Sequence, residues 1–174
     1  SFNELVKQFY NNGYKITVLS SKIQKTQYYD VVRYSNLEDY KELLASHNIL
    51  IGMDSFPVHY AAHVAGVPTI CLFGNTKPVN SDARVSDHYQ YVTGELKCAG
   101  CFSFDKCTVN NKKTCDNFPD AAQVYKTAIK MLEQLYNKKH FEEDVLINKI
   151  NEGKLDEAVA IIEAEINTNP NNAE

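Results

Sequence analysis

The turn at residues 54–57, Asp-Ser-Phe-Pro, combines residue types that can begin a helix and bind an anion. It follows a short apolar run at residues 49–53, which predicts a buried strand, and it precedes an alanine-rich segment, which predicts a helix. Ser55 is a favoured N-cap residue, and Pro57 suits a first helical turn because its missing N–H is not needed there. A helix that begins at the carboxyl end of a parallel strand can bind phosphate through its free backbone N–H groups. We therefore predict an anion site at this turn, with the ring of His59 as a further donor.

A purely structural interpretation of the same residues is open as well. Asp54 and Ser55 would then cap the helix and do nothing more, and His59 would be a partly buried histidine whose ring nitrogens are satisfied by protein groups.

Several motifs recur in a fixed order from this turn onward. Asp-Ser-x-x-x-His at residues 54–59 precedes an alanine-rich helix, Gly-Val-Pro-Thr-Ile-x-Leu-Phe-Gly-x-Thr at residues 66–76, and a cysteine cluster. This order resembles the C-terminal half of the heptosyltransferase family, glycosyltransferase family nine, over roughly residues 1–136. The resemblance implies a GT-B architecture, in which two Rossmann-like domains hold a sugar nucleotide mainly through the C-terminal one.

The resemblance also implies an activity and a set of site residues. The chain would be the donor-binding half of an enzyme that moves a sugar, such as a heptose, from an ADP- or UDP-linked donor to a glycan or lipid-linked acceptor of the lipopolysaccharide type. No metal is needed for that transfer, and the general base is expected in a preceding N-terminal domain, so this chain alone should contain no catalytic residue and be inactive. The donor-binding residues would be Asp54, Ser55, Phe56, His59, Gly74 and Thr76.

Two other functions are alternatives to the transferase. The chain could belong to a non-catalytic interaction scaffold in which a Rossmann-like domain carries helical repeats that bind a protein partner. An epimerase of related GT-B shape is less favoured, because the order of the motifs fits the heptosyltransferases better.

Alternating apolar strands and amphipathic helices predict an α/β fold with a parallel, Rossmann-like sheet and flanking helices. Helices are expected at residues 2–12, 37–46 and just after Ser55, and strands at 15–19, 31–32, 49–53, 69–73 and 89–92. A chain that opens on a helix followed by a strand lacks the first strand of this repeat. We therefore expect the sequence to be a fragment of a longer protein.

Four cysteines lie in a loop at residues 97–116 that has little helical or strand periodicity. Cys98, Cys101, Cys107 and Cys115 could together hold a structural Zn²⁺, which thiolates bind tetrahedrally and which would replace the core that the loop lacks. Only the first pair has the two-residue spacing of a zinc knuckle, so disulfides and free thiols remain alternatives.

The C-terminal segment predicts helices only. A helix at about 118–136 would close a domain spanning residues 1–137, and helices at 139–151 and 154–168 would form a hairpin within residues 138–174. The second of these helices resembles half of a tetratricopeptide repeat, which would bind a protein partner together with further repeats. The alternative is a hairpin that only packs on the preceding domain.

The composition excludes some partners. A net charge of −4 and a sequence pI near 5.7 argue against a nucleic-acid-binding protein, which usually has a clustered basic excess. No run approaches the length of a transmembrane helix, and residues 1–4 do not begin a signal peptide. We therefore expect a cytoplasmic protein. A lipid-linked acceptor would favour its peripheral contact with the inner face of the membrane.

Overall fold

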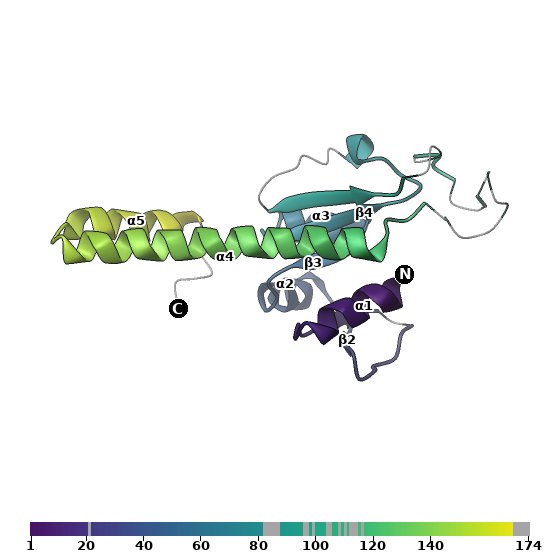
Figure 1. Cartoon of the computed structure of the whole chain (residues 1–174), viewed down its shortest axis with the longest axis horizontal. Coiled ribbons are helices and arrows are strands. Elements are labelled where there is room, and N and C mark those ends of the chain that lie inside the picture. The colour runs from purple at the N-terminus through teal and green to yellow at the C-terminus, as the bar shows by residue number, and fades with distance from the viewer. Residues whose placement is uncertain are drawn as a thin grey trace. The chain divides into compact units, whose positions relative to one another are not determined.

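The computed structural model describes residues 1–20, 22–81, 88–95, 98, 100–103, 106–107, 109, 111, 115 and 117–168. The chain forms two compact units, Ser1–Leu132 and Glu133–Glu174 (Figure 1). The first unit contains the strands and the first three helices, and the second is helical. The predicted class, parallel α/β with flanking helices and a helical C-terminal part, is confirmed.

Two parallel sheets make up the first unit. One pairs β1 (Thr17–Leu19) with β2 (Asp30–Val32), and the other has the strand order β3 (Leu50–Met53), β4 (Thr69–Phe73), β5 (Tyr89–Thr93). In the second sheet Gly52 lies opposite Cys71, and Cys71 lies opposite Tyr91. The five predicted strands are therefore all present, and they are divided between two sheets.

Three helices accompany these strands, and two of them have clear start signals. In α1 (Phe2–Asn11) Ser1 and Glu4 form a reciprocal capping box. In α2 (Leu37–Ala45) the Asn36 side chain accepts a hydrogen bond from the Asp39 N–H at 2.8 Å. The third, α3 (Phe56–His63), follows β3, and a short 3₁₀ helix, η1 (Pro78–Ser81), follows β4.

Helix α3 packs closely on the sheet because β3 contains a glycine. A Cβ atom at Gly52 would lie 2.5 Å from Cγ2 of Val58, closer than packed atoms approach. Val58 is buried with Cys71, Phe73 and Tyr89 in one hydrophobic cluster. The turn that begins α3 is thus fixed against β3 and β4 by packing.

The longest helix corrects one prediction. We expected a break between residues 136 and 139, but α4 runs without interruption from Ala121 to Asn151. No glycine or proline occurs between residues 133 and 151, so nothing stops the helix once it has formed. Helix α5 (Leu155–Thr168) follows a turn at Gly153, whose φ of 74° is a left-handed conformation that glycine adopts without strain.

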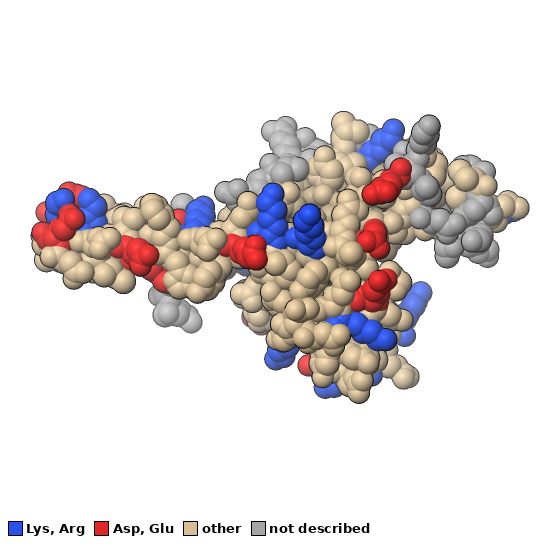
Figure 2. Space-filling model, in the orientation of Figure 1, with Lys and Arg blue, Asp and Glu red and all other residues tan. Residues whose placement is uncertain are grey.

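The face of the molecule seen in Figure 2 carries charges of both signs. Figure 2 shows Lys and Arg side chains interspersed with Asp and Glu side chains over the visible face, without a large patch of one sign. Within the described residues, no helix combines the length and the apolar character that a membrane crossing requires.

Candidate functional site

The turn from β3 into α3 is open to solvent at the carboxyl end of the sheet. The Asp54 N–H extends the ladder by donating to the Leu72 carbonyl at 3.2 Å, and the chain leaves the sheet directly afterwards. Ser55 occupies the N-cap position in an extended conformation, with φ −165° and ψ 165°. Ser55 is exposed, as is Phe56, whose exposed fraction is 59%. The turn therefore leaves room for a ligand.

The side chain of Ser55 does not act as the predicted cap. Its hydroxyl donates to the Met53 carbonyl at 2.9 Å, and α3 has no side-chain cap hydrogen bond. The reason is that the Val58 and His59 N–H groups already donate to the Ser55 carbonyl, at 3.1 and 3.3 Å. Ser55 was correctly predicted to occupy the N-cap position, but the prediction that its side chain caps the helix was wrong.

The same contacts limit which amides can bind an anion. Pro57 has no N–H, and the next two amides of the helix are taken by the Ser55 carbonyl. The amides of Ser55 and Phe56 precede them in the turn and have no acceptor among the hydrogen bonds of the described residues. An anion at this turn would bind these two amides, whereas a usual helix N-terminus offers all the free N–H groups of its first turn.

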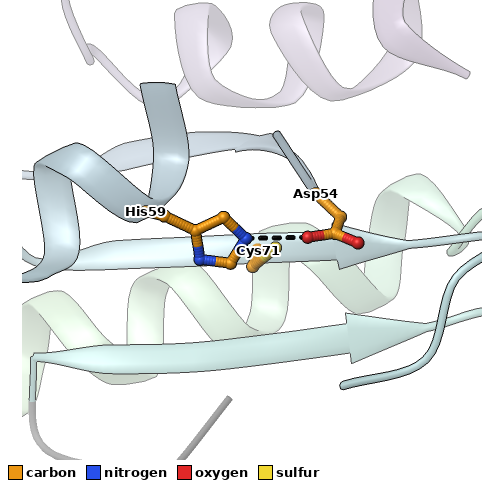
Figure 3. Close-up of side chains that lie close together, drawn as sticks. All are labelled: Asp54, His59 and Cys71. Atoms are coloured by element: carbon orange, nitrogen blue, oxygen red, sulfur yellow. Dashed lines mark hydrogen bonds and ion pairs between the residues drawn. The ribbon is translucent and has the colours of Figure 1, made fainter. Parts of the chain in front are cut away.

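Asp54 and His59 form a hydrogen-bonded pair at the turn. His59 Nε2 lies 2.8 Å from Asp54 Oδ1, and the two side chains are only 28% and 14% exposed. Figure 3 shows the imidazole and the carboxylate turned toward each other. Because an ionised carboxylate only accepts hydrogen bonds, Nε2 carries the proton of this bond. Nδ1 is then the ring nitrogen left for another group.

Cys71 of β4 lies beneath this pair. One ligating atom from each of Asp54, His59 and Cys71 lies within 4.8 Å of the others (Figure 3). Cys71 is fully buried, and burial raises the pKa of its thiol to about 11. Burial likewise raises the pKa of the neighbouring Tyr89 hydroxyl above its usual value. A metal would need the Cys71 thiolate and would compete with the Asp54–His59 hydrogen bond. The uncharged side chains of Cys71 and Tyr89 therefore fit a packing role beside this pair better than a metal centre.

A tyrosine that the sequence did not single out holds the first turn of α3. Tyr40 on α2 is fully buried, and its hydroxyl donates to the Pro57 carbonyl at 2.9 Å. Its ring stacks on Tyr34 with the centroids 4.5 Å apart. The apolar pattern of residues 37–46 predicted burial of Tyr40, but a bond across 17 residues has no local sequence signal.

Gly74 and Thr76 lie beyond the end of β4. Gly74 is buried, and a Cβ atom there would lie 3.1 Å from the ring of Phe118. The Asn117 side chain also donates to the Gly74 carbonyl at 3.3 Å. Gly74 therefore has a packing role in this structure, and Thr76 is half-buried. Donor contact by these two residues stays a prediction.

The cysteines of the loop are free thiols in the structure. Cys101 is exposed, and Cys98, Cys107 and Cys115 are half-buried. In the described part of the chain they do not form a group of three or more close metal-ligating side chains. Many of their sequence neighbours lie outside the described residues. The zinc site stays a prediction.

Comparison with protein families identifies a match. The family model of glycosyltransferase family 9 (heptosyltransferase) matches residues 1–112, which include all five strands, α3 and the turn described above. No curated protein and no solved structure matches the chain.

Proposed function

We propose that this chain, which belongs to glycosyltransferase family 9 (heptosyltransferase), is the donor-binding half of an enzyme that transfers a sugar from a nucleotide sugar. Heptose is the sugar that the family name suggests, and the acceptor would be a glycan or a lipid-linked glycan of the lipopolysaccharide type. The observation that carries the proposal is the turn at residues 54–56, at the carboxyl end of a parallel strand, in which Ser55 and Phe56 are exposed to solvent. Transfer would occur on the cytoplasmic side of a membrane.

The donor diphosphate would bind at the start of α3. The Ser55 and Phe56 amides would donate hydrogen bonds to it. The Ser55 hydroxyl would also donate to it, once its hydrogen bond to the Met53 carbonyl is broken. These donors, with the positive end of the α3 dipole, would stabilise the charge that develops on the departing nucleotide. No metal is required for this step.

Asp54 would act through His59 rather than on the phosphates. Two like charges in contact repel, so a carboxylate is a poor direct ligand for a diphosphate. Its hydrogen bond to Nε2 instead fixes the orientation of the imidazole and leaves Nδ1 for a contact with the donor. Asp54 is therefore a positioning residue in this proposal.

Phe56 would contact an uncharged part of the donor. Its ring is 59% exposed at the turn and lies 5.7 Å, centroid to centroid, from the ring of Tyr60. An exposed aromatic face beside an anion site suits stacking on a base or a sugar ring.

Thermal unfolding with a panel of ADP-, UDP- and GDP-linked sugars tests the donor site. We expect one nucleotide class to raise the melting temperature by a few degrees at saturation. Ser55→Ala and Asp54→Asn should remove most of that rise, and Asp156→Asn, on an exposed position of α5, should keep it. If no nucleotide shifts the unfolding temperature of the wild-type chain, the donor-site proposal is wrong.

A scaffold remains the second candidate, and one observation favours it. Apolar side chains on α4 and α5 are more than 40% exposed, among them Phe141, Ile147, Leu155, Val159 and Ile162. Exposed apolar side chains of this kind suit contact with a further helical repeat or a protein partner. In that case the panel of nucleotides would leave the unfolding temperature unchanged, while the full-length protein would bind a partner through these helices.

We also propose that Cys98, Cys101, Cys107 and Cys115 bind one structural zinc ion. Four thiols in one loop are a suitable ligand set. Metal analysis of protein purified under reducing conditions should give close to one zinc per chain, and a folded, metal-free sample would refute the site.

A further inference from the structure

The two helices of the second unit have very little core of their own. Among the described side chains of this unit, only that of Ala158 is buried. The ion pair of Lys149 with Glu157 joins α4 to α5, and both of its partners are partly exposed. Large apolar side chains on the same part of α4 are left in contact with water. A surface of this kind is stabilised when another chain covers it.

Exposed residues on this part of α4 recur at intervals of seven. Tyr136, Glu143 and Ile150 form one series, and His140 and Ile147 form a second, three or four residues from the first. This is the spacing of the d and a positions of a coiled coil, which follow one stripe along a helix. Tyr136, Ile147 and Ile150 are 64%, 54% and 48% exposed, and the His140 and Glu143 side chains are 48% and 50% exposed. We call these five residues the seam.

The seam faces away from α5. Lys149, which contacts α5 through Glu157, lies roughly 140° around α4 from the middle of the seam. Val145 lies roughly 180° from it and is half-buried, whereas each of the five seam residues is exposed. Helix α5 therefore packs against the opposite side of α4 and leaves the seam exposed.

The middle of the seam is polar and contains one basic and one acidic side chain. His140 Nδ1 lies 3.3 Å from Glu143 Oε2, and the rings of Tyr136 and His140 are 4.1 Å apart, centroid to centroid. Apolar residues flank this pair, with Tyr136 before it and Ile147 and Ile150 after it. The order along the seam is thus apolar, basic, acidic, apolar. Such an order is complementary to its own reverse.

We propose that the seam binds the same seam of a second copy of this chain, with the two α4 helices antiparallel and related by a two-fold axis. The axis passes midway between residues 140 and 143. Each a position then packs beside a d position of the other copy, so Tyr136 lies beside Ile147 of the partner subunit and His140 beside Glu143 of the partner subunit. Each of these pairs occurs twice, because the interface is isologous.

The two polar residues select a second copy and fix its direction and register. In a parallel pair His140 would face His140 and Glu143 would face Glu143, so like groups would meet. Sliding the antiparallel pair by one heptad would place both polar side chains against isoleucines in one direction, where neither has a partner. In the other direction it would bring Glu143 beside Glu133, two like charges. Polar residues at core positions set the register of coiled coils in this way.

The interface is short, so the dimer should be weak. The seam spans little more than two heptads, and a contact of this size lies at the low end of specific interfaces. We expect the dimer to form at chain concentrations on the order of 100 µM. The inference goes beyond the proposed function, because it concerns the second unit alone and involves no nucleotide.

Sedimentation velocity of the 174-residue chain, from about 5 µM to about 1 mM, tests the inference. The chain has a mass of 19.7 kDa, and its apparent mass should rise toward twice that value as the concentration increases. A reducing agent is needed throughout, because exposed thiols such as that of Cys101 could otherwise link two copies by a disulfide.

A matched pair of variants isolates the seam. Ile147→Glu and Asn148→Glu add the same charge at neighbouring exposed positions of α4, and only the first lies in the seam. Ile147→Glu should weaken the dimer at least about tenfold, because the new carboxylate would be covered without a partner. Asn148→Glu should change it less than about twofold. Circular dichroism should show wild-type helix content for both variants.

Exchange of the two polar residues tests the antiparallel direction. Glu143→Lys and His140→Glu, each alone, should weaken self-association, since the facing pairs become basic with basic or acidic with acidic. In an equimolar mixture, the introduced lysine faces the introduced glutamate, and the unchanged His140 faces the unchanged Glu143. The mixture should therefore associate at least as strongly as the wild type.

Four results would overturn the inference. One is a chain that stays monomeric up to about 1 mM, which would leave the seam to a different partner. The second is a dimer that Ile147→Glu leaves unchanged, and the third is equal weakening by Asn148→Glu, because either would place the contact on another surface. The fourth is a mixture of the two charge variants that associates no better than each variant alone. None of these results depends on donor binding.

Discussion

The two sheets of the first unit are built from similar sequences and differ in burial. In β4, which has partners on both edges, every residue except Leu72 is buried. All three residues of β1, which has a partner on one edge, are only half-buried. Apolar residues are enough to form either strand, but burial of nearly every residue along a strand is seen here where both edges are paired. The sheet that contains β3 and β4 also carries the candidate site.

The largest predicted effect compares one valine from each sheet. Val92 of β5 is 3% exposed, whereas Val18 of β1 is half-buried and lines an apolar cavity. Val92→Ala should lower the free energy of unfolding by about 2 kcal/mol, and Val18→Ala by about 1 kcal/mol or less. Urea denaturation with a constant m-value measures both differences. Equal effects of Val92→Ala and Val18→Ala on the free energy of unfolding would mean that the two sheets do not differ in packing as the structure indicates.

A smaller effect concerns how α2 supports the site-bearing sheet. Tyr40→Phe removes the hydroxyl that donates to the Pro57 carbonyl and should lower the free energy of unfolding by about 1 kcal/mol. Tyr34→Phe, in the ring that stacks on Tyr40 and is 37% exposed, is the control and should change stability by less than about 0.5 kcal/mol. If both variants unfold at the same urea concentration as the wild type, the Tyr40 hydroxyl does not stabilise this turn.

Local patterns predicted most of the first unit correctly. Apolar runs located all five strands, and amphipathic patterns located the helices at residues 2–12 and 37–46. The strand-to-helix turn at Asp54 and Ser55 was also located correctly. Two predictions were wrong: the break in α4, where no residue disfavours the helix, and the cap by Ser55, whose hydroxyl bonds backward to Met53.

The sequence by itself determined the order of strands and helices and the turn at which an anion could bind, because these depend on residues a few positions apart. The tertiary structure alone decided that His59 bonds to Asp54 above Cys71, and that Tyr40 holds Pro57. It alone placed β1 and β3, each of which pairs on a single edge within the described residues, beside one apolar cavity. These contacts form when distant segments pack together, and the side chains involved lack a local pattern that specifies their partners.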